Sequence, residues 1–168
     1  MLKYTIAFLK RGDEILLLNR EKPYWMGCWN GVGGKLLPNE TPLDCVLREI
    51  KEETGIKLET IHYKGTVTWN VGSFDGGGMY LYLADLPANF SYSTPTKTDE
   101  GILDWKKIDW ILDTENQGIA NLHYFFPAML HDNQTYEHRF IYEGDLVKAF
   151  TSIPQNLEVC HSNQVPVK

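Results

Sequence analysis

The sequence predicts a single domain of the α/β (α+β) class, in which helices pack on a mixed β-sheet. Short apolar runs separated by turn residues recur along the chain, and one amphipathic helix interrupts them between residues 41 and 55. Strands and helices alternate without the regular spacing of repeated strand–helix–strand units, so a doubly wound parallel sheet is not expected. The chain has 168 residues, of which 43% are hydrophobic, and this is enough for one core.

The first elements of the predicted sheet are two N-terminal strands. Apolar runs at residues 4–9 and 15–19 predict a hairpin that turns at Gly12-Asp13. We expect the segment 29–34, which is rich in glycine, to be a short strand or a loop. Further strands are predicted at residues 62–71, 79–86 and 104–108, the first two joined by the sequence Ser-Phe-Asp-Gly-Gly-Gly.

The last third of the chain predicts one helix and a second hairpin. The helix is expected from about residue 121 to residue 130. The segment 137–153 predicts two strands about the turn Glu143-Gly144-Asp145. Residues 154–168 are polar and irregular, so we predict one domain over residues 1–153 followed by a flexible tail.

Charge and composition exclude several classes of function. The formal net charge is −6 and no cluster of Lys and Arg is present, whereas proteins that bind long nucleic acids usually carry a basic face. No apolar run approaches the roughly 20 residues of a membrane span. Three dispersed cysteines predict neither a disulfide framework nor a metal knuckle, which favours a reducing, cytoplasmic setting. A small polyanion remains a possible ligand, provided that cations hold its phosphates.

The helix of residues 41–55 has clear start and stop signals. Thr41 is a good N-cap, Pro42 suits the first helical position, and Asp44 completes a Thr-x-x-Asp start. Gly55 supplies the stop. Between them, apolar residues recur at i, i+3, i+4 and i+7 and form one stripe, made of Leu43, Val46, Leu47 and Ile50.

Three glutamates lie on a different arc of this helix. Glu49, Glu52 and Glu53 are neighbours at helical spacing and repel one another by roughly 0.2–0.5 kcal/mol per pair. One interpretation is a solvated acidic face. The other is a divalent cation site, because Mg²⁺ and Mn²⁺ prefer carboxylate and carbonyl oxygens. The adjacent glycine-rich segment 31–35, in which backbone can approach a ligand closely, favours the second interpretation.

These residues resemble a known signature. Gly34, five residues, Glu40, seven residues, and then the run Arg48 to Ile56 (REIKEETGI) match the Nudix box, GX5EX7REUXEEXGU, at every specified position. The resemblance implies a Nudix-type α/β/α sandwich with a mixed sheet over residues 1 to about 153. It also implies a hydrolase that cleaves a nucleoside diphosphate linked to another group with the help of divalent cations, Mg²⁺ or in its place Mn²⁺.

The resemblance to the Nudix box implies a role for each of these residues. The metal ligands would be Glu49, Glu52 and Glu53, joined by the carbonyl of Gly33. Arg48 would orient these glutamates together with Glu40. Substrate contacts would come from the glycines Gly33 and Gly34 and from Lys35, for which the alternative is an ordinary surface lysine.

The segment WNGVGGK, residues 29–35, is similar to the WNGFGGK of the oxidised purine nucleoside triphosphatases and to related MutT-type sequences. By this resemblance Asn30 would hydrogen-bond a purine, since an amide is both donor and acceptor. The alternative is a side chain that caps a turn. Tyr24 lies where that subfamily has an aromatic residue that stacks on the base.

The segment TDEGILDWKKID, residues 98–109, resembles the part of the same subfamily in which a Glu binds metal or acts as the base on water. Glu100 is favoured for this role over Asp99, and the alternative is an ordinary acidic turn. The subfamily's pair of Asp residues that reads the oxidised base would fall near residues 119–122. Here the sequence has no acidic pair, and Asn121 is the candidate substitute.

The resemblance therefore implies hydrolysis of a nucleoside triphosphate, oxidised purines such as 8-oxo-dGTP included, to a monophosphate and pyrophosphate. The partner would be a small nucleotide, with no nucleic-acid polymer and no membrane, and the protein would be a monomer or a homodimer. One alternative is a Nudix enzyme of another nucleoside diphosphate derivative, such as NADH, ADP-ribose, a dinucleoside polyphosphate or capped RNA. A second alternative is a nucleotide sensor without activity.

Overall fold

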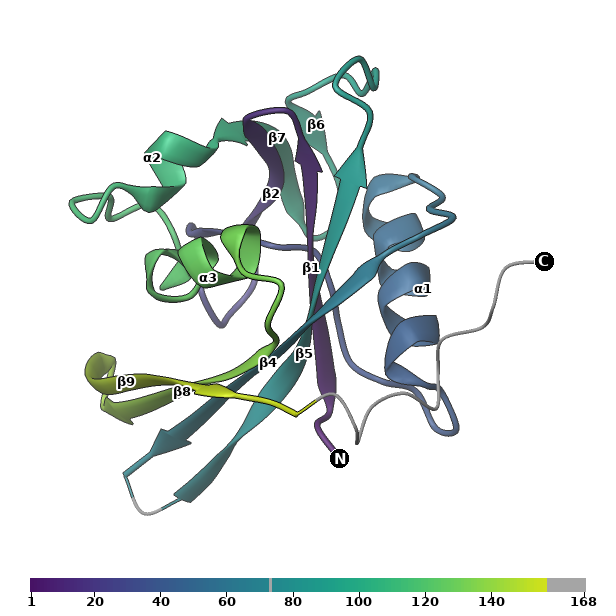
Figure 1. Ribbon diagram of the computed structural model, residues 1–168. Coiled ribbons are helices and arrows are strands. Elements are labelled where there is room, and N and C mark those ends of the chain that lie inside the picture. Colours follow the sequence, from purple (N-terminus) through teal and green to yellow (C-terminus); the bar gives the residue numbers. More distant parts are fainter. Residues whose placement is uncertain (73, 157–168) are drawn as a thin grey trace.

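The computed structural model describes residues 1–72 and 74–156, which form one mixed sheet with helices on both faces (Figure 1). The strand order is β6-β7-β2-β1-β5-β4-β8-β9, and β3 pairs with β2 beside this path. Two pairs, β1–β5 and β4–β8, are parallel and the others are antiparallel. The mixed sheet is as predicted. The strands are β1 Tyr4–Arg11, β2 Glu14–Arg20, β3 Trp29–Asn30, β4 His62–Val71, β5 Phe74–Leu86, β6 Thr96–Lys97, β7 Gly101–Lys107, β8 Tyr136–Glu143 and β9 Leu146–Pro154.

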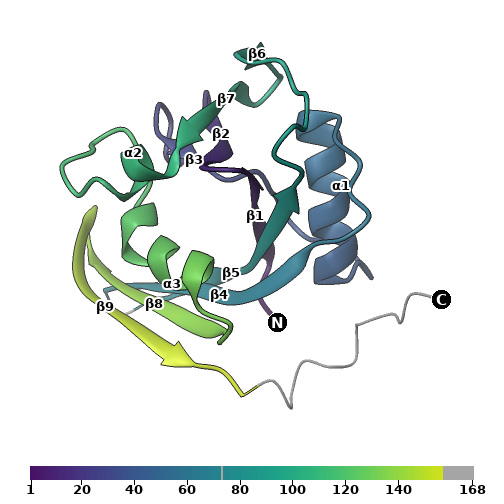
Figure 2. The same cartoon turned by 45° about the horizontal axis from the view of Figure 1, so that its top comes forward.

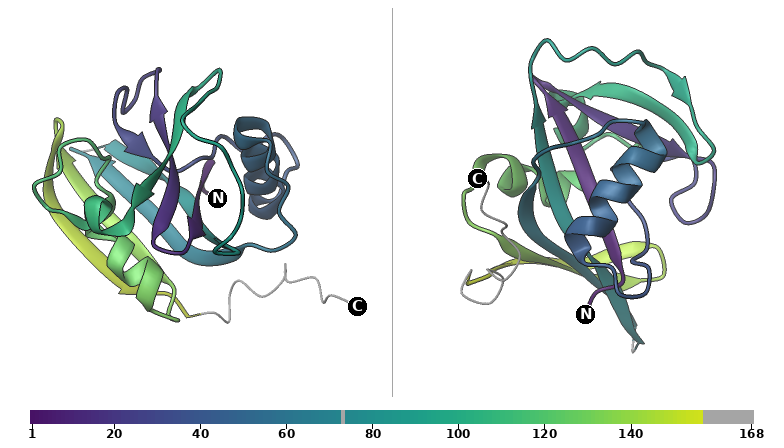
Figure 3. Two further views of the ribbon diagram at one scale, coloured as in Figure 1. Left: turned by 90° about the horizontal axis from the view of Figure 1, so that it is seen from above. Right: turned by 90° about the vertical axis from the view of Figure 1, so that its right-hand side faces the viewer.

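The helices form a layer on each side of the sheet (Figures 1 and 3). Helix α1 (Pro42–Thr54) covers one face. The other face carries α2 (Ile108–Leu112), a 3₁₀ turn η1 (Leu122–Tyr124) and α3 (Phe126–His131). Strands β8 and β9 curve beneath α3 at their end of the sheet (Figure 2). No helix within the described ranges is long and apolar enough to span a membrane.

Each helical layer has its own core, because alternate residues of the strands point to opposite faces. In β1, Ile6 and Phe8 belong to the core under α3, whereas Ala7 and Leu9 belong to the core under α1. All four side chains are buried. Strand β1 thus contributes side chains to both cores and pairs with β2 and β5 in the middle of the sheet.

Helix α1 begins and ends where the sequence predicts. The Thr41 hydroxyl accepts a hydrogen bond from the Asp44 amide at 3.1 Å, and Gly55 adopts the left-handed conformation with φ of 76°. Val46 and Ile50 of the predicted stripe are fully buried in the core under α1. The stripe holds the helix to the sheet, and the glutamates are left on another side of it.

The predicted helix of residues 121–130 is wrong as a continuous helix. The chain makes the 3₁₀ turn η1 and then starts afresh at Phe126 in α3. Pro127 explains the break, because proline has no N–H to bond to residue 123 and its ring clashes with the carbonyl four residues earlier. In the first turn of a new helix the same proline is tolerated.

The glycines Gly76, Gly77 and Gly78 were expected in a connection between two strands, but they lie within β5. Atoms of Trp69 on the paired strand β4 occupy the space that their Cβ atoms would need at Gly76 and Gly77. Glycine is therefore required in the strand for close approach, not for a turn. The short elements β6 and α2 were not predicted. Residues 157–168, most of the predicted tail, lie outside the described residues.

His138 on β8 is a buried titratable group in the core under α3. Its side chain is completely buried against the rings of Phe125 and Phe150, and its Nδ1 atom lies 2.9 Å from the Ser152 hydroxyl. No partner for Nε2 exists among the residues that the structure describes. Burial lowers the pKa of His138 to about 4 from an ordinary 6.5. The fold therefore holds this imidazole neutral.

We predict that His138 makes the fold sensitive to acid. The unfolded chain binds a proton at His138 before the folded one does, so stability is lost as the pH falls from 6.5 towards about 4. Between pH 7 and pH 5 the wild type should lose about 2 kcal/mol more unfolding free energy than His138→Gln. Urea denaturation at both pH values measures this difference. The exposed His62→Gln is the control, and equal losses in wild type and His138→Gln would contradict the prediction.

Candidate functional site

Arg48, in the middle of α1, is the centre of an ion-pair network. Its Nε and Nη2 atoms donate to the two carboxylate oxygens of Glu40 at 2.7 and 2.9 Å. Its Nη1 atom donates to Glu49 at 2.7 Å and to Glu52 at 3.1 Å, and Nη2 reaches the Lys35 carbonyl at 3.3 Å. The hydrogen bonds from Arg48 lower the pKa of Glu40 to about 2. One guanidinium thus offsets the repulsion between carboxylates on this side of the helix.

Glu53, at the end of α1, is a carboxylate whose pKa is raised by its surroundings. The Gly33 amide donates to its Oε2 atom at 2.8 Å. Desolvation nevertheless raises the pKa of Glu53 to about 7, and the negative charges of Glu49 and Glu100 act in the same direction. Glu52, by contrast, has a side chain that is 60% exposed. Around Glu53 there is an excess of negative charge, which favours a bound cation.

Two glycines allow the backbone to lie close to these carboxylates. A Cβ atom at Gly34 would collide with the Glu49 carboxylate, so this position holds a glycine because the glutamate occupies the space. At Gly33 a Cβ atom would collide with the Thr5 carbonyl of β1, and φ is +153°. At Gly33 and Gly34 the absence of a side chain therefore lets the backbone lie directly against β1 and against the Glu49 carboxylate.

Glu100 is brought to this cluster by the pairing of β2 with β7. Arg20, the last residue of β2, lies opposite Gly101, the first residue of β7. The Glu21 amide donates to the Glu100 carbonyl at 3.0 Å, and Lys22 forms an exposed ion pair with the Glu100 carboxylate at 2.6 Å. The turn that carries Glu100 is thereby fixed beside the end of β2, where its charge acts on Glu53.

Arg20 is a residue of this cluster that sequence reasoning missed. Its positive charge opposes the rise in the pKa of Glu53, so it lies near that carboxylate. Its Nε atom is buried and has no hydrogen-bond partner in the described part of the chain. In the sequence, Arg20 is a cation that follows the apolar run of residues 15–19. This pattern is too common to single out one residue. Its position follows from strand pairing.

The oxygen donors suit a hard divalent cation, but they are not arranged around one. Within residues 1–72 and 74–156, no group of three or more His, Cys, Asp or Glu side chains is placed so that it can hold a metal. The reason lies in the contacts above: Arg48 binds Glu49 and Glu52, and the Gly33 amide binds Glu53. The residues fit the expected cation in donor type and charge. Their role as its ligands stays a prediction.

The predicted substrate contacts are less closely associated. The side chain of Asn30 accepts a hydrogen bond from the Gly31 amide at 2.8 Å, as expected for a residue that caps a turn. Lys35 is exposed, and Tyr24, in the loop between β2 and β3, is 87% exposed. Asn121 donates to the Tyr142 hydroxyl at 2.6 Å. The base-binding roles remain predictions.

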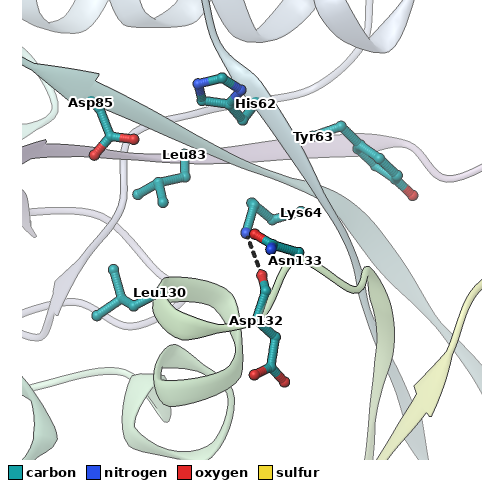
Figure 4. Close-up of a pocket in the computed structure, with 8 residues that line it drawn as sticks. All are labelled: His62, Tyr63, Lys64, Leu83, Asp85, Leu130, Asp132 and Asn133. Carbon is teal, nitrogen blue, oxygen red and sulfur yellow. Dashed lines mark hydrogen bonds between the residues drawn. The ribbon is translucent and has the colours of Figure 1, made fainter.

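A cavity of about 380 Å³ lies elsewhere on the molecule (Figure 4). It is bounded by the start of β4, the end of β5 and the segment that ends α3, and Leu83 and Leu130 form its apolar side. The Lys64 ammonium donates to the Asp132 carbonyl at 2.9 Å across it. None of the residues predicted for the functional site lines this cavity.

Comparison with known proteins identifies the family. The NUDIX domain model matches residues 3–139, which is most of the chain. The chain belongs to the Nudix family. Its large mixed sheet with few helices is the Nudix fold, and the MutT protein of Bacillus halodurans superimposes with a TM-score of 0.70 and 26% identity, over 90% of this chain and 97% of that one.

Two relatives of known activity differ in how much of this Nudix hydrolase they match. The oxidized purine nucleoside triphosphate hydrolase of Mus musculus is 28% identical over 153 residues, which cover 88% of this chain and 92% of that protein. The NAD-capped RNA hydrolase NudC of Pseudomonas fluorescens is 38% identical, but over only 64 residues, 38% of this chain and 23% of that protein. Nudix hydrolases generally require divalent metal ions, in agreement with the donor set. The protein is therefore MutT-like.

We predict that Gly34→Ala displaces Glu49 without disrupting the fold. The new methyl group meets a carboxylate at the end of a flexible side chain, so the glutamate moves aside and the backbone does not. Mn²⁺ affinity should fall about 10- to 100-fold, while the free energy of unfolding changes by less than about 1 kcal/mol. Isothermal titration and urea denaturation measure these two quantities.

Gly144→Ala is the matched control for this substitution. Gly144 lies in the β8–β9 turn with φ of 61°, and its Cβ atom would meet nothing within 4 Å. The left-handed conformation costs a non-glycine residue about 1–2 kcal/mol, so this variant should lose stability and keep its affinity for Mn²⁺. Unchanged affinity in Gly34→Ala would show that Gly34 does not position Glu49.

Proposed function

We propose that this Nudix hydrolase uses Mg²⁺, or Mn²⁺ in its place, to cleave nucleoside triphosphates to a monophosphate and pyrophosphate. Oxidised purine nucleotides such as 8-oxo-dGTP are the proposed substrates, and removal of damaged nucleotides from the precursor pool is the proposed role. The observation that carries the proposal is the cluster of carboxylates on α1, in which Arg48 holds Glu49 and Glu52 and the Gly33 amide holds Glu53. A divalent cation would balance this charge and hold the phosphates of an anionic substrate on an acidic protein.

In this proposal, one set of residues binds the metal and another set binds the substrate. The ligands would be the carboxylates of Glu49, Glu52, Glu53 and Glu100 and the carbonyl of Gly33. When bound, the metal supplies charge neutralisation and an activated water for in-line attack on phosphorus. Arg48 keeps the glutamates in place and Glu40 holds Arg48. Arg20 and Lys35 are the cations proposed for the substrate phosphates, because the charge of Arg20 acts on Glu53 and the Lys35 carbonyl accepts a hydrogen bond from Arg48.

The preference for an oxidised purine is supported by similarity to the mouse protein over nearly its full length. Asn30 would read the base, and Tyr24 of the β2–β3 loop would stack on it. Asn30 uses only its oxygen in the contact with Gly31, so its amide N–H groups remain for a base. Neither residue faces the cavity of Figure 4, which is not proposed as part of the site.

A second candidate is hydrolysis of another nucleoside diphosphate derivative, such as NADH, ADP-ribose or a dinucleoside polyphosphate. The observation in its favour is the segment 118–122, which has no acidic pair to read an oxidised base. Asn121 instead donates to the Tyr142 hydroxyl, a neutral pair. The similarity to NudC covers too little of either chain to favour capped RNA. A silent nucleotide sensor is less well supported, because all the box carboxylates are present.

The deciding experiment is product analysis with a panel of substrates. The purified protein is incubated with Mg²⁺ and dGTP, 8-oxo-dGTP, 2-hydroxy-dATP, ADP-ribose or NADH, and release of pyrophosphate and of orthophosphate is measured separately. Pyrophosphate released fastest from an oxidised purine supports the proposal. Turnover confined to ADP-ribose or NADH supports the second candidate. Tight nucleotide binding without Mg²⁺-dependent turnover of any compound would identify a sensor.

We predict that Glu53→Gln retains the fold and loses most turnover. The substitution keeps the size of the side chain and removes one charge from a group that Glu49 and Glu100 already repel. The amide oxygen can still accept from Gly33, so stability should be unchanged or slightly higher. Because a metal ligand loses its charge, kcat should fall at least about 100-fold. Glu59→Gln, the same change at an exposed position after α1, is the control. Wild-type turnover by Glu53→Gln would refute the assignment of the site.

A further inference from the structure

The C-terminal end of α1 is tied to the loop that joins β5 to β6, residues 87–95. The Tyr92 hydroxyl of this loop donates to the Thr54 carbonyl at 2.7 Å. Carbonyls in the last turn of a helix have no partner within the helix, and Gly55 satisfies that of Lys51. Tyr92 satisfies another, on the residue that directly follows Glu53.

The loop is itself held against the sheet. The Trp105 indole N–H on β7 donates to the Tyr92 carbonyl at 3.1 Å, and the two rings meet edge to face at 6.4 Å. Arg11 at the end of β1 stacks on the Trp105 ring at 3.8 Å and donates to the Phe90 carbonyl at 2.9 Å. Tyr92 is half-buried against the core under α1, and burial raises its pKa, so its hydroxyl remains a donor. These contacts with Arg11 and Trp105 hold the loop against β1 and β7.

The same segment leads directly to the other acidic element of the site. After the loop comes β6, and then the turn at Thr98–Gly101. The Thr98 hydroxyl accepts from the amides of Glu100 and Gly101, each at 3.2 Å. Glu53 and Glu100 are 47 positions apart in sequence (100 − 53), yet the charge of one acts on the other. Tyr92 lies on the segment that joins their two elements.

The Gly33 amide holds the Glu53 carboxylate itself, and two further contacts at the end of α1 are local. The Thr54 hydroxyl donates to the Ile50 carbonyl at 2.6 Å, and the Ile56 amide donates to the Thr54 hydroxyl at 3.0 Å. Such bonds shape the helix end, but they do not place it relative to the turn that carries Glu100. The Tyr92 bond does, because it joins the helix end to a different segment.

We propose that Tyr92 is a positioning residue whose hydroxyl fixes the end of α1 that carries Glu53 relative to the turn that carries Glu100. The inference rests on the proposed function, in which both carboxylates bind the metal. Loss of the hydroxyl would let the helix end move, and a small displacement of a ligand weakens both metal binding and catalysis. The ring of Tyr92 would still fill its place against Trp105.

The test compares Tyr92→Phe with the wild type and with Tyr136→Phe in the full-length protein. Tyr136 is the matched control, because its hydroxyl donates to the Asp132 carboxylate at 2.9 Å between α3 and β8. Without metal, the amides of Gly55 and Ile56 should exchange about tenfold faster in Tyr92→Phe than in wild type. Its Mn²⁺ affinity should be about tenfold weaker, with lower kcat and little change in KM. Tyr136→Phe should show none of these changes.

Wild-type exchange rates and wild-type Mn²⁺ affinity in Tyr92→Phe would overturn the proposal. Equal changes in Tyr136→Phe would also overturn it, since they would reflect general destabilisation. Trp105→Phe, which removes the N–H that holds the Tyr92 carbonyl, is a second variant that should move the same readouts in the same direction. If the wild type hydrolysed no nucleotide, the proposed function would fail, whereas hydrogen exchange would still decide the role of Tyr92.

Discussion

The site depends on one cation that the chain itself provides, the guanidinium of Arg48. Helical spacing places like charges next to one another, and without a counter-charge they would repel or turn away from each other. Arg48 holds Glu49 and Glu52 while its other edge is held by Glu40 in a bidentate pair. A lysine could not replace it, because a single ammonium lacks the planar fork that reaches several carboxylates at fixed angles. The glutamates are thereby kept together before any metal binds.

Burial then separates the glutamates into different environments. Glu52 is mostly exposed, whereas Glu53 is desolvated and receives a hydrogen bond from the Gly33 amide. Desolvation, together with the charges of Glu49 and Glu100, raises the pKa of Glu53 to about 7, and the charge of Arg20 acts in the opposite direction. A divalent ion would gain most where water is excluded and negative charge is unbalanced. On the same helix, the Glu53 carboxylate is held by the Gly33 amide, whereas the Glu52 side chain is mostly exposed.

Local signals in the sequence were sufficient for α1 and for the box, because a helix is specified by neighbours within four residues. Thr41, Gly55 and the apolar stripe gave its limits, and the glutamates followed from their spacing. Contacts between distant segments were not predictable in this way. The approach of Glu100 and Arg20 to Glu53 depends on the register of β2 and β7. Trp69 on β4 likewise lies against Gly76 and Gly77 of β5, a contact between strands that the sequence of the glycines does not reveal.

The glutamate helix packs against the central strand, whereas Tyr24 and Asn121, two of the residues considered for reading the base, lie in connecting segments. Gly33 lies directly against the carbonyl of Thr5 on β1, and its amide donates to the Glu53 carboxylate. The carboxylates are thus placed by a backbone contact at Glu53 and by the side chain of Arg48 at Glu49 and Glu52. Tyr24 is exposed in the loop between β2 and β3, and Asn121 directly precedes η1. Connecting segments tolerate changes in sequence at little cost to the fold, so substitutions there would alter the proposed base contacts while the glutamate helix is kept.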